Sequence, residues 1–349
     1  MKDLRILLTG AGAPGAGSII ECLKDNGECK VEIIGIDKRA NVNTAHLFEK
    51  VYEVPGAEEE AFIDKVKDIC KKESIDVIVP IVTKELLKFA SAKKEFEEIG
   101  TKVNVIDFEA LSIANDKVKL FDFLNENGLK TPEYYAVKNV SEIVEFTKKL
   151  GYPIENVCLK QACGNGSRGI RILSEKSSRY DDFFNEKPNS MFCTLSEVIN
   201  ILSEKDVIPS MMVMEYLPGN EWGVDLIAKN GVVSNIMCRE TTVIQHSITL
   251  ECITKKNNDI ETFCKKVAEV LNITGNIGFD FKYDKEGKSQ IIEINPRLTA
   301  TVAINKASGI NFPWLGVKQC LGYDINEVKD INYVKMKRRY MEEYTLLEK

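Results

Sequence analysis

The stretch that decides the fold is "IGFDFKYDKEGKSQIIEINPR", residues 277–297. Two runs rich in apolar residues flank a turn that contains Gly287, which is the pattern of a β-hairpin. Asp280 lies on the first strand. Glu293 and Asn295 lie two positions apart on the second strand, so their side chains share one face. The pattern therefore predicts three oxygen-bearing side chains that converge on one side of a hairpin.

Oxygen ligands without histidine or thiol are typical of a Mg²⁺ site, in which the ion keeps waters and shares phosphate oxygens. Arg297, two positions beyond Asn295, offers a planar fork to a phosphate or acyl phosphate. A hairpin with a solvated acidic face is the alternative. The flanking apolar residues argue against it because they pin the acidic face to one side: Phe279, Phe281, Ile291, Ile292 and Ile294.

A second candidate feature is "CLKQACGNGSRGIRIL", residues 158–173. Lys160 ends a predicted strand, and a glycine-rich loop follows it. Backbone amides of such a loop can close over phosphates while the lysine reaches their oxygens. The loop lacks the G-K-[ST] entry into a helix that a Walker A loop has. A glycine hairpin without a ligand is an equally good interpretation of this stretch alone.

The third feature is "VMEYLPGNEWGVDL", residues 213–226. An apolar strand reaches Glu215, bends at Pro218 and Gly219, and resumes with Glu221 and Asp225. Acidic residues around such a bend could accept hydrogen bonds from an adenine amino group and from ribose hydroxyls. By itself this is a weak signal.

The N-terminal stretch "ILLTGAGAPGAGSII", residues 6–20, raises the question of dinucleotide binding. Gly10, Gly12 and Gly15 spell G-x-G-x-x-G after an apolar run, and a second run ends on Asp37. This is the fingerprint of an NAD site. Alternation of apolar runs with amphipathic segments, up to about residue 107, predicts a parallel sheet covered by helices on both faces. Within this Rossmann-like domain, residues 84–99 are expected to form one helix and residues 102–107 a strand.

Beyond this domain, residues 108–150 are expected to be mostly helical, with one helix over residues 111–128. From residue 157 onward the pattern becomes antiparallel. It includes separate strands over "GVVSNIMCRE" and "VIQHSITLEC", residues 231–240 and 243–252.

Composition limits the classes of protein that fit. The chain has 349 residues, 44% of them apolar, and a net charge of −6, which favours a globular protein of two or three domains and gives no reason to bind nucleic acid or a membrane. Ten cysteines occur singly beside only two histidines, so we expect reduced, mostly buried thiols without a zinc site. We expect no signal peptide, no transmembrane helix and a cytoplasmic location. His46 and His246 are interpreted as scaffold residues.

The three features, in this order, resemble the ATP-grasp superfamily. With the N-terminal domain included, the chain is similar to the carbamoyl-phosphate-synthase-like branch of carboxylate–amine ligases. The resemblance rests on "NDK" at 115–117, "LKQACGNGSRGI" at 159–170, "EYLPGNEWGVD" at 215–225 and "IGFDF…IIEINPR" at 277–297. It implies α/β plus α+β architecture: a Rossmann-like domain (1–107), then an ATP-grasp fold of two α+β subdomains (108–214, with the lid loop, and 215–349, with the metal site).

The resemblance also implies roles for individual residues. Lys117 and Lys160 would reach the phosphates of ATP, under a lid formed by residues 164–169. The metal ligands would be Asp280, Glu293 and Asn295. Arg297, and less firmly Arg239, would contact the transferred phosphoryl group. The full set of implied ATP-binding residues is Lys117, Lys160, Gly164, Gly166, Ser167, Gly169, Glu215, Tyr216, Leu217 and Glu221. Arg168 departs from the family lid and is interpreted as a surface residue, with an extra phosphate contact as the alternative.

The implied activity is amide-bond formation through an acyl phosphate, with ATP and Mg²⁺ as cofactors, Mn²⁺ as an alternative ion, and ADP and phosphate as products. The partners would be a small-molecule carboxylate and an amine, and the chain could form a homodimer. Carbamoyl phosphate synthesis, a nucleotide-binding module without turnover, and an NAD-dependent enzyme stay as alternatives. If the chain is a ligase, the turn at residues 10–15 lines the substrate-binding side of the N-terminal domain. The start of the helix that follows this turn could still bind an anion.

Overall fold

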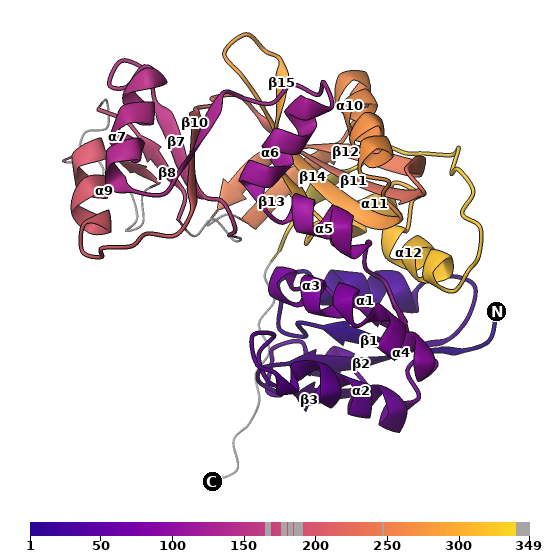
Figure 1. The fold of residues 1–349 in the computed structure, drawn as a ribbon. Coiled ribbons are helices and arrows are strands. Elements are labelled where there is room, and N and C mark those ends of the chain that lie inside the picture. Colours follow the sequence, from indigo (N-terminus) through magenta and orange to yellow (C-terminus); the bar gives the residue numbers. More distant parts are fainter. Residues whose placement is uncertain (165–168, 176–179, 181–183, 185–190, 246–247, 340–349) are drawn as a thin grey trace.

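The computed structural model describes residues 1–164, 169–175, 180, 184, 191–245 and 248–339. The described residues form three sheets (Figure 1). One belongs to the N-terminal part, drawn in indigo. The second lies in a small lobe, and the third is the large orange sheet beside it. One parallel sheet followed by two mainly antiparallel sheets agrees with the fold class predicted from the sequence, a Rossmann-like domain and two α+β subdomains. The boundaries at residues 107 and 214 stay predictions.

The N-terminal sheet is parallel throughout, in the order β3-β2-β1-β4-β5. The central strands β1, β2 and β4 are almost entirely buried, as expected for a sheet with helices on both faces, whereas the edge strand β3 is partly exposed. The elements are β1 (Leu4–Thr9), α1 (Ala16–Lys24), β2 (Val31–Asp37), β3 (Lys50–Glu53), α2 (Ala61–Glu73), β4 (Val77–Val79), α3 (Thr83–Ser91), α4 (Lys93–Glu98) and β5 (Lys102–Val103), with a 3-10 turn at Ala45–Leu47.

Two predictions in this domain are wrong in detail. The single helix expected over residues 84–99 is divided into α3 and α4 at Ala92. The aromatic rings of Phe89 and Phe96, one on each helix, lie 5.8 Å apart, so the break keeps both rings in one core. The strand expected over residues 102–107 is only β5, because Asp107 already precedes the next helix.

The small lobe contains β6 (Tyr134–Val137), β7 (Val157–Gln161), β8 (Arg171–Leu173), β9 (Phe192–Cys193) and β10 (Met211–Glu215), in the order β6-β10-β7-β8-β9. Helices α7 (Val140–Lys149) and α9 (Leu195–Leu202) belong to the same lobe (Figure 1). The helix predicted over residues 111–128 is in fact two helices, α5 (Phe108–Ala114) and α6 (Lys117–Glu126). Asp116 causes the division, because its carboxylate accepts hydrogen bonds from the amides of Val118 and Lys119 and so starts a new helix.

The large sheet is antiparallel, in the order β15-β14-β11-β12-β13-β16. Its elements are β11 (Glu221–Lys229), β12 (Val232–Gln245), β13 (Ile248–Thr254), α10 (Asn258–Val270), β14 (Gly275–Tyr283), β15 (Ser289–Asn295), α11 (Ala303–Ala307), α12 (Phe312–Cys320) and β16 (Lys335–Lys337). The two strands predicted over residues 231–252 are divided elsewhere, since β12 continues to Gln245. His246 lies outside the described residues.

Helix α12 attaches the large sheet to the N-terminal domain. Trp314 belongs to the buried cluster that also contains Ile19 and Leu23 of α1. The indole nitrogen of Trp314 and the ammonium of Lys318 both donate to Glu28 Oε1, at 3.1 and 2.8 Å. The N-terminal domain and the large sheet therefore share one core.

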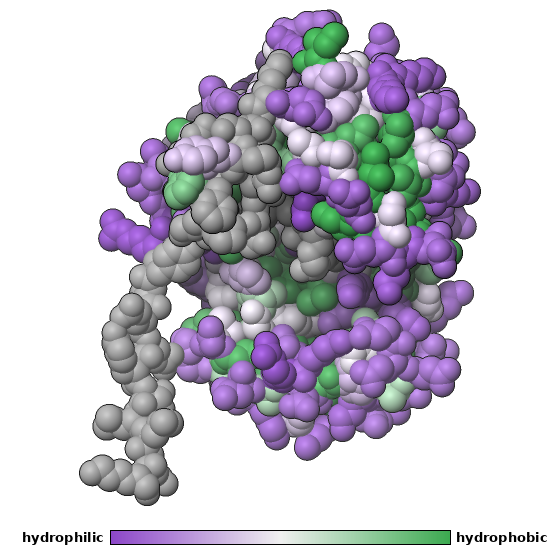
Figure 2. All heavy atoms as spheres, turned by 90° about the vertical axis from the view of Figure 1, so that its left-hand side faces the viewer, coloured by the Kyte–Doolittle hydropathy of each residue, from purple (hydrophilic) through white to green (hydrophobic). Residues whose placement is uncertain are grey.

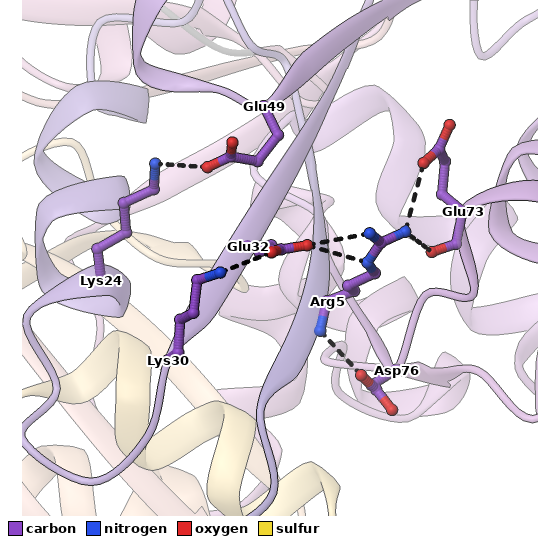
Figure 3. Close-up of polar contacts among 7 residues, drawn as sticks. All are labelled: Arg5, Lys24, Lys30, Glu32, Glu49, Glu73 and Asp76. Carbon is purple, nitrogen blue, oxygen red and sulfur yellow. Dashed lines mark hydrogen bonds and ion pairs between the residues drawn. The ribbon is translucent and has the colours of Figure 1, made fainter.

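Several ion pairs lie on the surface of the N-terminal domain (Figure 3). Arg5 lies between Glu32 and Glu73, and its backbone amide donates to Asp76. Such solvent-exposed pairs each contribute at most about 1 kcal/mol to stability. The buried clusters rather than this network therefore hold the domain together.

The ten cysteines all lie in the described part of the chain and form no disulfide there; five are buried and Cys163 is exposed. Among the helices that the structure describes, none is both long enough and apolar enough to cross a bilayer.

The protein's own groups fill the space around the glycines of the N-terminal fingerprint. The amide of Gly12 donates to Asp37 Oδ2 at 3.0 Å, so the acid that would bind a ribose hydroxyl instead holds the turn. A Cβ atom added at Gly15 would lie 2.8 Å from Cα of Ala300. The loop after β15 therefore covers the start of α1, where a pyrophosphate would have to approach. This geometry favours a structural role for the fingerprint.

We expect Gly15→Ala to destabilise the protein by about 1–3 kcal/mol, because the new methyl group overlaps the backbone of Ala300. Urea denaturation measures the change. Gly17→Ala is the matched control on the same helix. The nearest atom there is 3.4 Å from the added Cβ, so alanine should raise stability by about 0.5–1 kcal/mol through its helix propensity. Equal effects of the two substitutions would contradict the close approach at Gly15.

Candidate functional site

The predicted metal ligands lie on neighbouring positions of β14 and β15. Asp280 pairs with Glu293, and Gly278 pairs with Asn295, in an antiparallel register that shifts just after Asp280. The side-chain amide nitrogen of Asn295 donates to Asp280 Oδ2 at 2.8 Å. The hairpin thus brings the three predicted oxygen-bearing side chains together, although the amide oxygen of Asn295 is turned toward Arg297.

Two lysines from other parts of the chain reach the same hairpin. The Nζ atom of Lys117, at the first turn of α6, lies 3.1 Å from Glu293 Oε2 and donates to the carbonyl of Gly164 at 2.9 Å. Lys160 of β7 donates to the carbonyl of Ile292 at 3.2 Å. Only 6% and 2% of these lysines are exposed. Burial lowers the pKa of Lys160, as expected for an ammonium group removed from water.

The acidic residues of the site oppose one another's ionisation. Burial, together with the charges of Glu293 and Glu221, raises the pKa of Asp280 to about 7, although Arg239 and Asn295 oppose the rise. The pKa of Glu221 is raised as well, mainly by burial. A divalent cation would relieve this repulsion, so the charge pattern fits one.

The donor set fits Mg²⁺ better than a closed metal cage. Within the described ranges, no three His, Cys, Asp or Glu side chains are grouped closely enough to hold a metal ion by themselves. A cation here would take oxygens of Asp280, Glu293 and Asn295 and complete its shell with water and phosphate oxygens, which is how Mg²⁺ is usually held.

The segment predicted to hold adenine connects the small lobe to the large sheet. Glu215 ends β10, Leu217 is buried, and Glu221 begins β11. Burial raises the pKa of Glu215, and the neighbouring charges of Asp284 and Glu133 add to this rise. Gly219 donates to the carbonyl of Tyr283 at 2.9 Å, which fixes the bend beside the hairpin. Tyr216 lies between these residues, with the ammonium of Lys282 6.0 Å from its ring centroid.

Asp225 does not face a nucleotide, contrary to the hypothesis drawn from its position in the sequence. Its side chain is 3% exposed and forms an ion pair with Arg239, which is 4% exposed. Thr299 and Asn305 also donate to its carboxylate. Asp225 therefore compensates a buried guanidinium. The phosphate contact of Arg239 stays a prediction, with this guanidinium already engaged by Asp225 and Thr299.

Arg297 connects the hairpin to the N-terminal domain. Its Nε atom donates to the hydroxyl of Thr83, at the start of α3, at 3.1 Å, and its Nη1 atom donates to the carbonyl of Leu298 at 3.0 Å. The guanidinium therefore lies where the hairpin, the loop after β15 and the N-terminal domain meet. Figure 2 shows the molecular surface hollowed where the N-terminal domain meets the lobes above it.

The predicted lid is described only at its ends. Gly164 accepts the hydrogen bond from Lys117, and Gly169 has a φ of 72°, a left-handed conformation that favours glycine. Gly166, Ser167 and Arg168 lie outside the described residues.

Sequence analysis missed Glu85, in the first turn of α3. Its Oε2 atom is buried and has no hydrogen-bond partner in the part of the chain that the structure describes. The available signal was an acidic residue three positions after the apolar run "DVIVPIV", at the edge of a parallel sheet where ligands bind.

Comparison with known protein families finds two matches that together cover both parts of the chain. Residues 207–343 match the family described as "ATP-grasp in the biosynthetic pathway with Ter operon". Residues 6–104 match the family described as "PylC-like, N-terminal domain".

Similar curated proteins include carbamoyl-phosphate synthase of Methanobrevibacter smithii, which is 25% identical over 324 residues, covering 88% of this chain and 79% of that protein. The carbamoyl phosphate synthase large chain of Clostridium acetobutylicum is also 25% identical, over 77% of this chain. The match spans only 24% of that large chain's own length. The chain thus corresponds to about a quarter of the clostridial protein.

Among solved structures, the biotin carboxylase domain dimer of Hydrogenobacter thermophilus 2-oxoglutarate carboxylase, in complex with MgADP, ADP and bicarbonate, has a TM-score of 0.68. It is 17% identical and covers 95% of this chain and 73% of that chain. At this level of identity the likeness concerns the fold.

Proposed function

The chain belongs to the ATP-grasp superfamily, and on this premise we propose that it is an ATP-dependent carboxylate–amine ligase. The terminal phosphoryl group of ATP would pass to a substrate carboxylate, giving an acyl phosphate and ADP. An amine would then attack the acyl carbon, lose a proton, and release phosphate. The product would contain a new amide bond.

One observation carries this proposal. Lys117 and Lys160, from two different segments, reach the hairpin that carries Asp280 and Glu293. Phosphoryl transfer needs positioning and neutralisation of charge more than a covalent nucleophile. Buried lysines beside carboxylates that suit a cation supply both requirements.

The other predicted residues complete the proposed ATP site. Glu215, Tyr216 and Leu217 would line the adenine, Glu221 the ribose, and residues 164–169 the phosphates. Arg297 would contact the transferred phosphoryl group. Mg²⁺, with Mn²⁺ as an alternative ion, would neutralise charge on the phosphate oxygens when bound by the hairpin.

Two alternatives keep specific support. Carbamoyl phosphate synthesis is supported by the names of the similar curated proteins. A module that binds nucleotide without turnover would need the same ATP site. The hydrogen bond from Gly12 to Asp37 and the close approach of Ala300 to Gly15 argue against the NAD alternative. A homodimer belongs to the proposal because a structural neighbour is described as a domain dimer.

The first experiment is a thermal-shift assay with MgATP, followed by phosphate release in pairwise mixtures of small carboxylates and amines. Release that requires both an acid and an amine supports the ligase. Release with bicarbonate and ammonia alone supports carbamoyl phosphate synthesis, and nucleotide binding without release in any mixture supports the module. Stabilisation by NADH and none by MgATP would refute all three. Light scattering of the purified protein tests the homodimer.

A further inference from the structure

The N-terminal sheet has a topological switch point between β1 and β4. From β1 the chain proceeds to β2 and β3 on one side, and then to β4 and β5 on the other. In open parallel sheets, ligands bind in the crevice at the carboxyl ends of the strands at such a point. Thr83 lies at this edge and receives the hydrogen bond of Arg297. The crevice therefore adjoins the place where we expect the phosphoryl group.

Glu85 lies at this switch point, two residues beyond Thr83. Its Oε2 atom is shielded from solvent and has no hydrogen-bond partner among the described residues. The Thr9 hydroxyl, at the end of β1, hydrogen-bonds to the Glu85 side chain, Asp37 repels its charge, and Lys38 offsets it. A buried carboxylate oxygen without a donor is costly to keep. A site that retains one is suited to a ligand that donates to it.

The charge around the crevice favours a cationic donor. Lys38, whose charge favours the ionised form of Glu85, is itself paired at the surface, where its ammonium lies 2.7 Å from Glu58 Oε1. Lys38 also lines an open depression of about 420 Å³ together with Glu53 and Glu59. Carboxylates thus outnumber cations beside this edge of the sheet, which attracts positive charge.

We propose that Glu85 accepts the ammonium group of the amine substrate in the crevice between β1 and β4. The inference rests on the ligase function proposed above. It restricts the amine to one that is protonated when free, such as a primary or secondary amine or an amino acid, because an N-acylated nitrogen carries no charge. The substrate would then lie beside Arg297. Because an ammonium group has no lone pair, it would first pass one proton to the Glu85 carboxylate, and the neutral amine would then attack the acyl phosphate.

The test uses Glu85→Gln, which keeps the shape of the side chain and removes its charge. Glu109→Gln is the matched control, since Glu109 is exposed in the first turn of α5. The probes are ammonium chloride, methylamine, putrescine and the twenty L-amino acids, with N-acetyl forms of the amino acids. Each is titrated by calorimetry, with and without MgADP.

We expect the wild type and Glu109→Gln to bind at least one free amine and not its N-acetyl form. Glu85→Gln should bind that amine at least about tenfold more weakly, because a charge-assisted hydrogen bond is lost. Its affinity for MgADP should stay within about twofold of the wild type. Equal amine affinity in wild type and Glu85→Gln would overturn the inference, and so would a wild type that binds MgADP but no amine. Failure to bind MgADP at all would refute the proposed ATP site instead.

A stability measurement distinguishes a ligand-binding Glu85 from a structural one. Burial raises the pKa of Glu85 to about 7 from its usual 4.5. The folded state then binds more protons than the unfolded state between these values, so the contribution of Glu85 to stability falls as pH rises through this window. We expect Glu85→Gln to gain stability relative to the wild type between pH 5 and pH 8 in urea denaturation. A substitution that destabilises equally at both pH values would show that Glu85 is structural.

Discussion

Replacing Glu293 by glutamine is expected to reduce Mg²⁺-dependent phosphate release by about a hundredfold or more. Glu293 is opposite Asp280 on the hairpin and lies 3.1 Å from the ammonium of Lys117. The amide cannot neutralise either the cation or the lysine, although it keeps the same shape. Phosphate release in the most active substrate mixture measures the effect. Calorimetry of ADP with Mg²⁺ and with EDTA shows whether the metal-dependent part of binding is lost.

The matched control is Glu286→Gln in the turn of the same hairpin. Glu286 is exposed and pairs only with Lys288 among the contacts of the described chain, so its loss should change activity less than twofold, since exposed pairs contribute little. Should Glu293→Gln retain both turnover and metal-dependent nucleotide affinity, the metal site assigned to this hairpin would be wrong.

The largest loss of stability is expected for Asp225→Asn. This change leaves the guanidinium of Arg239 buried without its counter-charge, which costs about 3–5 kcal/mol. Thr299 and Asn305 donate to different oxygens of Asp225, so asparagine can keep only one of these two hydrogen bonds, and its loss of charge adds to the loss of the other. Urea denaturation at constant pH gives the change in unfolding free energy.

A double-mutant cycle with Arg239→Met measures the interaction free energy between Asp225 and Arg239. The double variant should recover part of the loss, because no unpaired charge remains in the core. The exposed pair of Lys229 and Asp324, with side chains 58% and 89% accessible, is the control and should show a coupling below about 1 kcal/mol. Strict additivity of Asp225→Asn and Arg239→Met would show that the two residues do not depend on each other.

The hairpin ligands were predictable because their geometry is local. Alternation along a strand places Glu293 and Asn295 on one face, and a short turn returns the chain beside Asp280. Lys117 was assigned only through the family resemblance, and Lys160 was first noted as a lysine before a glycine-rich loop. Nothing in the local pattern says that α6 and β7 reach residues of β15. Such contacts depend on how the lobes meet.

The partnership of Asp225 and Arg239 was not predictable from local sequence. Gly223 pairs with Arg239 across β11 and β12, and a Cβ at Gly223 would lie 2.6 Å from the guanidinium. The missing side chain leaves room for Arg239 to extend toward Asp225. A glycine within a strand signals a close approach, but the sequence alone does not identify the group that approaches. For the same reason the N-terminal glycines match a dinucleotide fingerprint, while Ala300, almost three hundred residues later, is what fills the space.

The fastening of the N-terminal domain to the large sheet has a mechanical consequence. Trp314 and Lys318 hold Glu28, Lys306 pairs with Asp25, and Arg297 holds Thr83. These contacts join the N-terminal domain and the large sheet into one unit. The small lobe is joined to this unit by two short connections, residues 127–133 and 216–220. We therefore expect an opening that admits ATP to move the small lobe relative to the other two parts, which would leave the edge of the N-terminal sheet at Thr83 unchanged.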